Sequence, residues 1–156
     1  MKEFETYTLP NGIKGIHRRV RSNVAHCALV INAGTRDEHR NEYGLAHFAE
    51  HAIFKGTEHR KAYQVNCRLE NLGGELNAYT TKEDTTIHAT VLRGDFTKAV
   101  ELVADVAFNS TFPDKELDKE REVIIDEINT YRDSPNDDIY DSFEDLIFAG
   151  SELGHN

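Results

Sequence analysis

His47-Phe48-Ala49-Glu50-His51 places two imidazoles and a carboxylate within about one and a half turns of a helix. Successive helical residues are rotated by about 100°, so the two histidines point within about 40° of each other. Glu50 lies about 60° to one side of His47. Neutral imidazoles bind zinc at about 2.0–2.1 Å, and an unbound carboxylate beside them can take a proton from the metal's water. The stretch therefore predicts a helix that carries part of a zinc site.

The order of this motif, His-x-x-Glu-His, is the inverted zinc-peptidase signature, the reverse of the commoner His-Glu-x-x-His. A plainer interpretation is a solvated helix face with two exposed histidines, because His and Glu are mostly surface residues. A catalytic zinc site has three protein ligands and leaves a fourth position to water. The zinc hypothesis therefore requires a third ligand from another part of the chain.

Candidates for that ligand lie in the stretch Glu120-Arg121-Glu122-Val123-Ile124-Ile125-Asp126-Glu127-Ile128. Glu120 and Glu127 are seven residues apart, which places them about 20° from eclipsed on one helix face. The plainer interpretation is a charged helix face with pairs such as Lys119 and Glu122. Spacing alone leaves Glu120, Glu122 and Glu127 as alternatives.

Several separated motifs follow one another along nearly the whole chain, at residues 9–12, 33–38, 44–51, 54–57, 73–80 and 120–128. In this order they resemble the pitrilysin or insulinase-type (M16) zinc metallopeptidases, a family that includes the mitochondrial processing peptidases. Several motifs in the right order are a stronger signal than one five-residue pattern. The resemblance implies a zinc-dependent metalloendopeptidase, a hydrolase that cleaves peptide bonds with a metal-activated water.

The resemblance also implies a role for each site residue. In the family, two motif histidines and a Glu on a later helix bind zinc, and the matching residues are His47, His51 and Glu127. Glu50 matches the general base. Glu120 matches a second carboxylate that supports the catalytic site, where such partners orient the metal ligands. One Zn²⁺ per chain is therefore expected.

Asn77, Ala78 and Tyr79 match the strand that lines the family's substrate site. A peptide or unfolded-protein substrate would pair with such a strand as an additional strand, since main-chain hydrogen bonds supply affinity and pockets supply selectivity. The plainer interpretation is that these residues are ordinary strand formers.

The family generally uses two related halves that close over the substrate, so the resemblance implies a second homologous domain or subunit as partner. The relatives also continue beyond the segment at residues 146–156. Residues 1–156 are therefore expected to form one partial peptidase domain, truncated at its C-terminal end. The rival hypothesis is a catalytically incomplete fragment, or a peptide-binding partner subunit that performs no chemistry.

Another enzyme class, the S-ribosylhomocysteine lyases, also combines a short chain with His-x-x-Glu-His. Those enzymes need a Cys metal ligand well downstream and another reactive Cys, whereas this chain has no Cys after Cys67. The lyase hypothesis is therefore disfavoured. Cys27 and Cys67 are too few for a disulfide framework and are expected to be small buried thiols.

The bulk composition indicates one soluble globular domain, with 156 residues, 38% hydrophobic and 29% charged. A formal net charge of −10 argues against nucleic acid as a partner, because polyanions are bound by clustered Lys and Arg. No apolar run of about 18 residues predicts a membrane span. The N-terminal residues 1–5 lack the apolar core of a signal peptide, which favours the cytoplasm.

Hydrophobic periodicity and turn residues predict an alternation of hairpins and helices. Strands are expected at residues 4–9 and 13–20 around an Asn-Gly turn, at 24–33 in the centre of a sheet, and at 75–81 and 85–92. Helices are expected at 43–54, at 62–72, from an N-cap at Asp95 to 108, from Pro113 through Glu127, and from about 136 to 149. This order predicts an α+β fold, an antiparallel sheet covered by helices. The remaining histidines are given no metal role: His17, His26, His39, His59, His88 and His155.

Overall fold

The computed structural model describes residues 4–154, except for the side chains of residues 137 and 138. Residues 1–3, at the N-terminus, and His155 therefore lie outside the described residues. The strands are β1 (Glu5–Thr8), β2 (Lys14–His17), β3 (Val24–Ile31), β4 (Glu75–Thr80) and β5 (Thr85–Leu92). The helices are α1 (Leu45–Ala52), α2 (Ala62–Glu70), α3 (Phe96–Asn109), α4 (Asp114–Arg132) and α5 (Pro135–Ile147), with short 3₁₀ turns η1 (Thr35–Asp37), η2 (Ile53–Lys55) and η3 (Arg93–Asp95).

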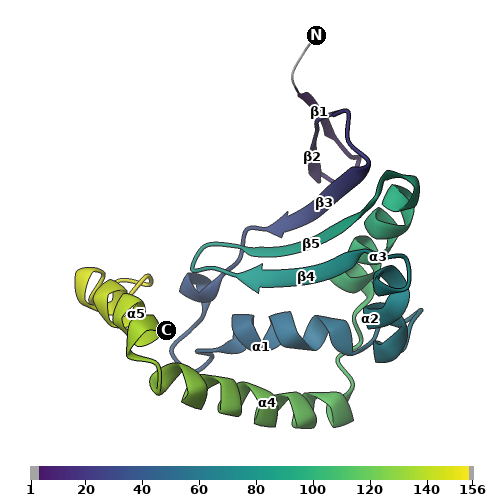
Figure 1. Ribbon diagram of the computed structural model, residues 1–156. Coiled ribbons are helices and arrows are strands. Elements are labelled where there is room, and N and C mark those ends of the chain that lie inside the picture. The colour runs from purple at the N-terminus through teal and green to yellow at the C-terminus, as the bar shows by residue number, and fades with distance from the viewer. Residues whose placement is uncertain (1–3, 155–156) are drawn as a thin grey trace.

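Two antiparallel sheets confirm the predicted α+β class (Figure 1). β1 and β2 form a separate hairpin in which Thr8 pairs with Lys14. The turn between them contains Gly12 at φ 91°, a left-handed conformation that glycine adopts without steric cost. β3, β5 and β4 form the second sheet in that order. The Asn-Gly hairpin and the later strand pair therefore form as predicted.

The prediction that residues 24–33 form a central strand is wrong, because β5 holds the central position. Within the described residues β3 pairs with β5 alone, and its burial alternates along the strand. Ala25, Cys27 and Leu29 pack against the core, whereas Val30 on the other face is 62% exposed. An apolar run thus indicates a strand but does not show how many strands flank it.

The hydrophobic core lies between the second sheet and helices α2 and α3. The predicted inward stripe of α3 is buried: Ala99, Leu102, Val103 and Val106. Val65 and Leu69 from α2 pack with this stripe against alternate residues of β5, namely Ile87, Ala89 and Val91. Residues three or four apart on a helix and two apart on a strand thus meet in one layer.

α1 follows the β4 edge of the sheet and lies between that edge and α4 (Figure 1). α4 begins after Pro113, as predicted, and runs beside α1. α5 packs against α4, and Lys82 in the β4–β5 turn lies 3.4 Å from Glu144 of α5. Among the residues described, no helix has both the length and the apolar character needed to cross a membrane.

Asp95 precedes α3 as predicted, but it does not cap the helix with its side chain. Its carboxylate instead accepts a hydrogen bond from Lys98 at 2.8 Å, one turn into the helix. The side-chain ion pair at i,i+3 therefore replaces the expected bond to a backbone amide.

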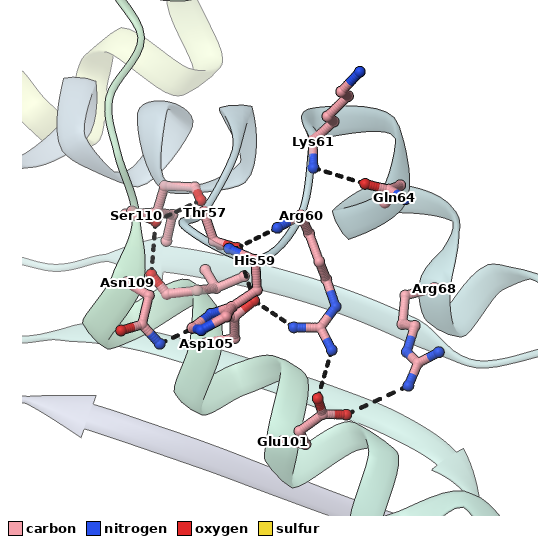
Figure 2. A network of polar contacts seen from close by, with 12 residues as sticks. Thr57, His59, Arg60, Lys61, Gln64, Arg68, Glu101, Asp105, Asn109 and Ser110 are labelled. Carbon is pink, nitrogen blue, oxygen red and sulfur yellow. Dashed lines mark hydrogen bonds and ion pairs between the residues drawn. The ribbon is translucent and has the colours of Figure 1, made fainter.

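A buried carboxylate ties the loop at residues 56–61 to α3 (Figure 2). Asp105 is 5% exposed and accepts hydrogen bonds from Thr57 Oγ1 at 2.8 Å, His59 Nδ1 at 2.6 Å and Asn109 Nδ2 at 3.0 Å, and another from Arg60. Burial alone would raise the pKa of Asp105, but these donors outweigh it and lower the pKa to about 2. The loop that follows η2 is thereby fixed to the core.

Replacing Leu102 with Ala is expected to lower the free energy of unfolding by about 2–5 kcal/mol, because the fully buried side chain leaves a cavity in the core. Val100→Ala on the same helix is the control, since Val100 is 44% exposed, and its effect should stay near 0.5 kcal/mol or less. Urea denaturation measures both changes, and equal effects would contradict this assignment of the core.

Replacing Asp105 with Asn is expected to destabilise the chain by about 2 kcal/mol at neutral pH, since a pKa lowered from 3.8 to about 2 corresponds to that energy. A carboxylate with a lowered folded-state pKa stabilises fully above its unfolded-state pKa and loses that contribution as the pH falls toward about 2.

The difference in unfolding free energy between D105N and the unmutated chain should therefore shrink as the pH falls from about 5 to about 3. Asp118→Asn is a suitable control, because Asp118 lies on α4 with a largely exposed side chain. A D105N effect that stays constant over this pH range would show that the charge of Asp105 is not what stabilises the loop.

Candidate metal centre

The helix that carries the motif begins with support from an upstream carboxylate. α1 starts after Gly44, which has φ 90° and offers no side-chain cap. Glu38, only 8% exposed, accepts hydrogen bonds from the backbone N–H groups of Gly44 at 2.9 Å and Ala46 at 2.6 Å. A carboxylate at this end satisfies amides that lack helical partners and interacts favourably with the helix dipole. Glu38 therefore fixes where α1 begins.

Sequence reasoning missed this role of Glu38, which enters there only as part of the motif at residues 33–38. The signal that could have found it is an acidic residue shortly before the first helical residue, where no Ser, Thr, Asp or Asn occupies the cap position.

His47 and His51 lie on one face of α1, as their spacing predicts. Their Nε2 atoms are 3.2 Å apart, and the ring planes are inclined by 89°. Both imidazoles are partly buried. The nitrogens therefore point to a common region between α1 and α4.

Glu127 of α4 reaches the same region from the opposite side. Its Oε2 lies 3.4 Å from His51 Nε2, and its Oε1 lies 4.0 Å from His47 Nε2. One ligand atom from each of the three residues lies within 4.8 Å of the others. Glu122, another candidate from the spacing, is exposed and is absent from this group.

Glu120 is not part of this group of ligand atoms. It contacts Nδ1, the other nitrogen of the His51 ring. Its Oε1 is 2.9 Å from His51 Nδ1, and its Oε2 is 2.6 Å from Lys55 Nζ. Burial alone would raise the pKa of Glu120, but the hydrogen bonds from Lys55 and His51 outweigh it and lower the pKa. The ionised carboxylate favours a proton on Nδ1, which leaves the lone pair of His51 on Nε2.

Glu50 directly precedes His51 on α1 and lines an open cavity with His51, Phe54 and Asn66. Its side chain is half-buried, and no hydrogen bond or ion pair holds it in the part of the chain that the structure describes. The carboxylate is therefore available for a water molecule or a ligand in the cavity.

The three substrate-strand candidates differ in their surroundings on β4, which forms one edge of the sheet. Asn77 lines the cavity together with Leu76, and its Oδ1 accepts a hydrogen bond from the backbone of Ala78 at 2.9 Å. The side chain of Ala78 is buried in the core. Tyr79 is exposed, and its ring lies 5.9 Å from that of His88. Of the three, Asn77 is the one that lines the cavity.

Comparison with known proteins identifies the same family as the motifs do. The model of the family described as insulinase, peptidase family M16, matches residues 17–155. An uncharacterized zinc protease of Rickettsia bellii is 37% identical over 156 residues, covering 99% of this chain and 38% of that protein. The mitochondrial-processing peptidase subunit beta of Caenorhabditis elegans is 33% identical, covering 95% of this chain and 32% of that protein.

Solved structures agree on the fold. A protease from Helicobacter pylori superposes with a TM-score of 0.91 at 24% identity, over 97% of this chain and 37% of that chain. This chain spans 32% to 38% of the length of these three proteins. On the family match over most of its length, the chain belongs to the insulinase family, peptidase family M16.

Proposed function

We propose that this chain provides the metal ligands and the general base of a zinc metalloendopeptidase. His47, His51 and Glu127 would bind one Zn²⁺, and Glu50 would move the proton. The observation that carries the proposal is the convergence of three ligand atoms from α1 and α4, with Glu50 on a cavity that His51 also lines. Membership of the insulinase family and the name of the Rickettsia bellii relative, a zinc protease, support it.

The donor set fits zinc. Four ligands at about 2.0–2.1 Å in a tetrahedron lie about 3.3 Å from one another. The two Nε2 atoms are 3.2 Å apart, and the distance from His51 Nε2 to Glu127 is 3.4 Å. The distance from His47 to Glu127 is 4.0 Å, and the half-exposed Glu127 side chain can shorten it by a small rotation. Two imidazoles and one Glu are also the ligands of known catalytic zinc sites that keep a position for water.

Zn²⁺ held by His47, His51 and Glu127 would supply a Lewis acid for the scissile carbonyl and would lower the pKa of a bound water to about 7. Glu50 accepts the proton of the attacking water and returns it to the leaving amine. Glu120 holds the His51 ring from Nδ1, so that the ring does not rotate away during the reaction.

The substrate would be a peptide or an unfolded protein, paired with β4 as an additional strand. β4 is an edge strand, and its Leu76 and Asn77 line the cavity that contains Glu50. An extended peptide beside them would place its main chain next to the general base. Ala78 and Tyr79 would contribute mainly backbone hydrogen bonds and an exposed ring.

A second homologous domain or subunit would complete the enzyme. This chain spans 38% and 32% of the two relatives, and one of them is named as a subunit. Closure of a partner over the cavity would exclude water and fix the substrate.

Glu50→Gln is expected to keep one zinc per chain and to lower peptide hydrolysis by about 10²- to 10⁴-fold, since the variant loses the base but none of the ligands. Elemental analysis gives the zinc content, and cleavage of a fluorogenic peptide with and without chelator gives the activity. Substantial activity in E50Q would remove Glu50 from this role. Zinc without chelator-sensitive turnover in the unmutated chain would favour a catalytically incomplete fragment or a peptide-binding partner over a chain that is active alone, and absence of zinc from the unmutated chain would contradict the proposal.

Glu127→Gln is expected to weaken zinc binding more than Glu120→Gln, because the first variant removes a ligand and the second removes support for a ligand. Competition with a chelator of known affinity measures both. Glu122→Gln on the same helix is the control and should bind zinc like the unmutated chain, because Glu122 lies outside the group. The reverse ranking would exchange the roles of Glu120 and Glu127.

A further inference from the structure

Lys55 makes a contact that the proposed reaction does not use. It ends η2, directly after the motif helix, and its side chain is 23% exposed. Its Nζ lies 2.6 Å from Oε2 of Glu120, while Oε1 of the same carboxylate lies 2.9 Å from His51 Nδ1. One carboxylate therefore bridges an ammonium group and an imidazole.

This bridge restricts the Glu120 carboxylate at both oxygens. The Glu120 side chain is only 9% exposed, so water offers few alternative partners. A carboxylate held at one oxygen alone can still turn about its side-chain bonds, whereas bonds at both oxygens fix its plane. The orientation of Glu120 therefore depends on Lys55 as well as on His51.

The site is also rich in negative charge. Glu50, Glu120 and Glu127 lie around two imidazoles. Among the interactions of the described residues, Lys55 is the one lysine or arginine that forms an ion pair with any of these three carboxylates. Buried carboxylates are costly unless they are paired, so Lys55 offsets the cost of placing Glu120 here.

We propose that Lys55 is a positioning residue of the metal centre. It fixes the Glu120 carboxylate, which holds the His51 ring with Nε2 directed at the point shared with His47 and Glu127. The inference rests on the proposed function, because it assumes that a cation binds at that point.

The sign of the effect on metal affinity separates this role from simple electrostatics. If Lys55 acted only as a positive charge near the cation, its removal would tighten zinc binding. If it acts through Glu120, its removal loosens His51 and weakens zinc binding, since loss of such supporting partners costs 10- to 100-fold in affinity.

The experiment measures Zn²⁺ affinity by chelator competition for the unmutated chain and for Lys55→Met, Lys55→Arg and Lys119→Met. K55M is expected to bind zinc about 10- to 100-fold more weakly. K55R keeps a cationic donor and should restore most of the affinity. K119M is the matched control, because it removes the same charge and a Lys119–Glu116 pair of 2.7 Å on the exposed side of α4, and it should bind like the unmutated chain.

A double variant tests whether Lys55 acts through Glu120. Adding Lys55→Met to Glu120→Gln should cause little further loss, since the carboxylate that Lys55 positions is already gone. Co²⁺ substitution gives a readout independent of activity: the visible absorption of the bound ion should change in K55M and not in K119M. Circular dichroism of the metal-free variants checks the fold, and if K55M does not fold, Lys55→Gln is judged by the same affinity ratio.

The proposal for Lys55 would be overturned if K55M or K55Q bound zinc as tightly as the unmutated chain or more tightly. It would also be overturned if adding K55M to E120Q lowered the zinc affinity as much as K55M does alone. These results would leave the proposed function intact, because the unmutated chain would still bind zinc. Absence of zinc binding by the unmutated chain would overturn both proposals.

Discussion

The packing of α1 against α4 is the constraint on which the candidate site depends. α1 supplies the two histidines and Glu50, and α4 supplies Glu120 and Glu127 from a distant part of the sequence. α1 is held in place from several directions: Glu38 binds its first amides, β4 borders it, and Asp105 anchors the loop beyond η2 to the core. A small shift between the two helices would separate the ligand atoms, so the packing of α1 against β4 and α4 sets the geometry of the site.

The electrostatics of this interface favour a cation. Glu127 lies near two imidazoles whose Nε2 atoms are 3.2 Å apart, Glu50 lines a cavity together with His51, and no lysine or arginine among the described residues pairs with either carboxylate. Convergent lone pairs and negative charges in a partly buried site repel one another unless a positive ion lies between them. Glu120 lies next to these residues, but it forms an ion pair with Lys55 and contacts Nδ1 of His51 rather than Nε2. Two carboxylates on one face of α4 thus have different surroundings, and the proposed centre assigns them different roles.

Local periodicity explains how much of this arrangement could be predicted. The i,i+4 spacing of His47 and His51 fixed their common face, and the apolar stripe of α3 is buried as its spacing indicated. The seven-residue spacing on α4 placed Glu120 and Glu127 on one face but could not distinguish them, because the choice depends on which nitrogen of His51 each reaches. The central position assigned to β3 failed for a similar reason: strand order is a tertiary property, and inward-facing residues make an edge strand look apolar. Lys55 and Glu120 lie on separate elements, so periodicity gives no signal for their contact. The role of Glu38 could be predicted only from an acidic residue placed before a helix that lacks a capping side chain.

The most direct test is a crystal structure of the zinc-loaded chain with anomalous scattering measured at the zinc absorption edge. It should show one anomalous peak per chain, about 2.0–2.1 Å from Nε2 of His47, Nε2 of His51 and a carboxylate oxygen of Glu127. Glu120 should remain on Nδ1 of His51, outside bonding distance of the ion. The absence of a peak between α1 and α4, or a peak bound by Glu120 in place of Glu127, would contradict the proposed centre.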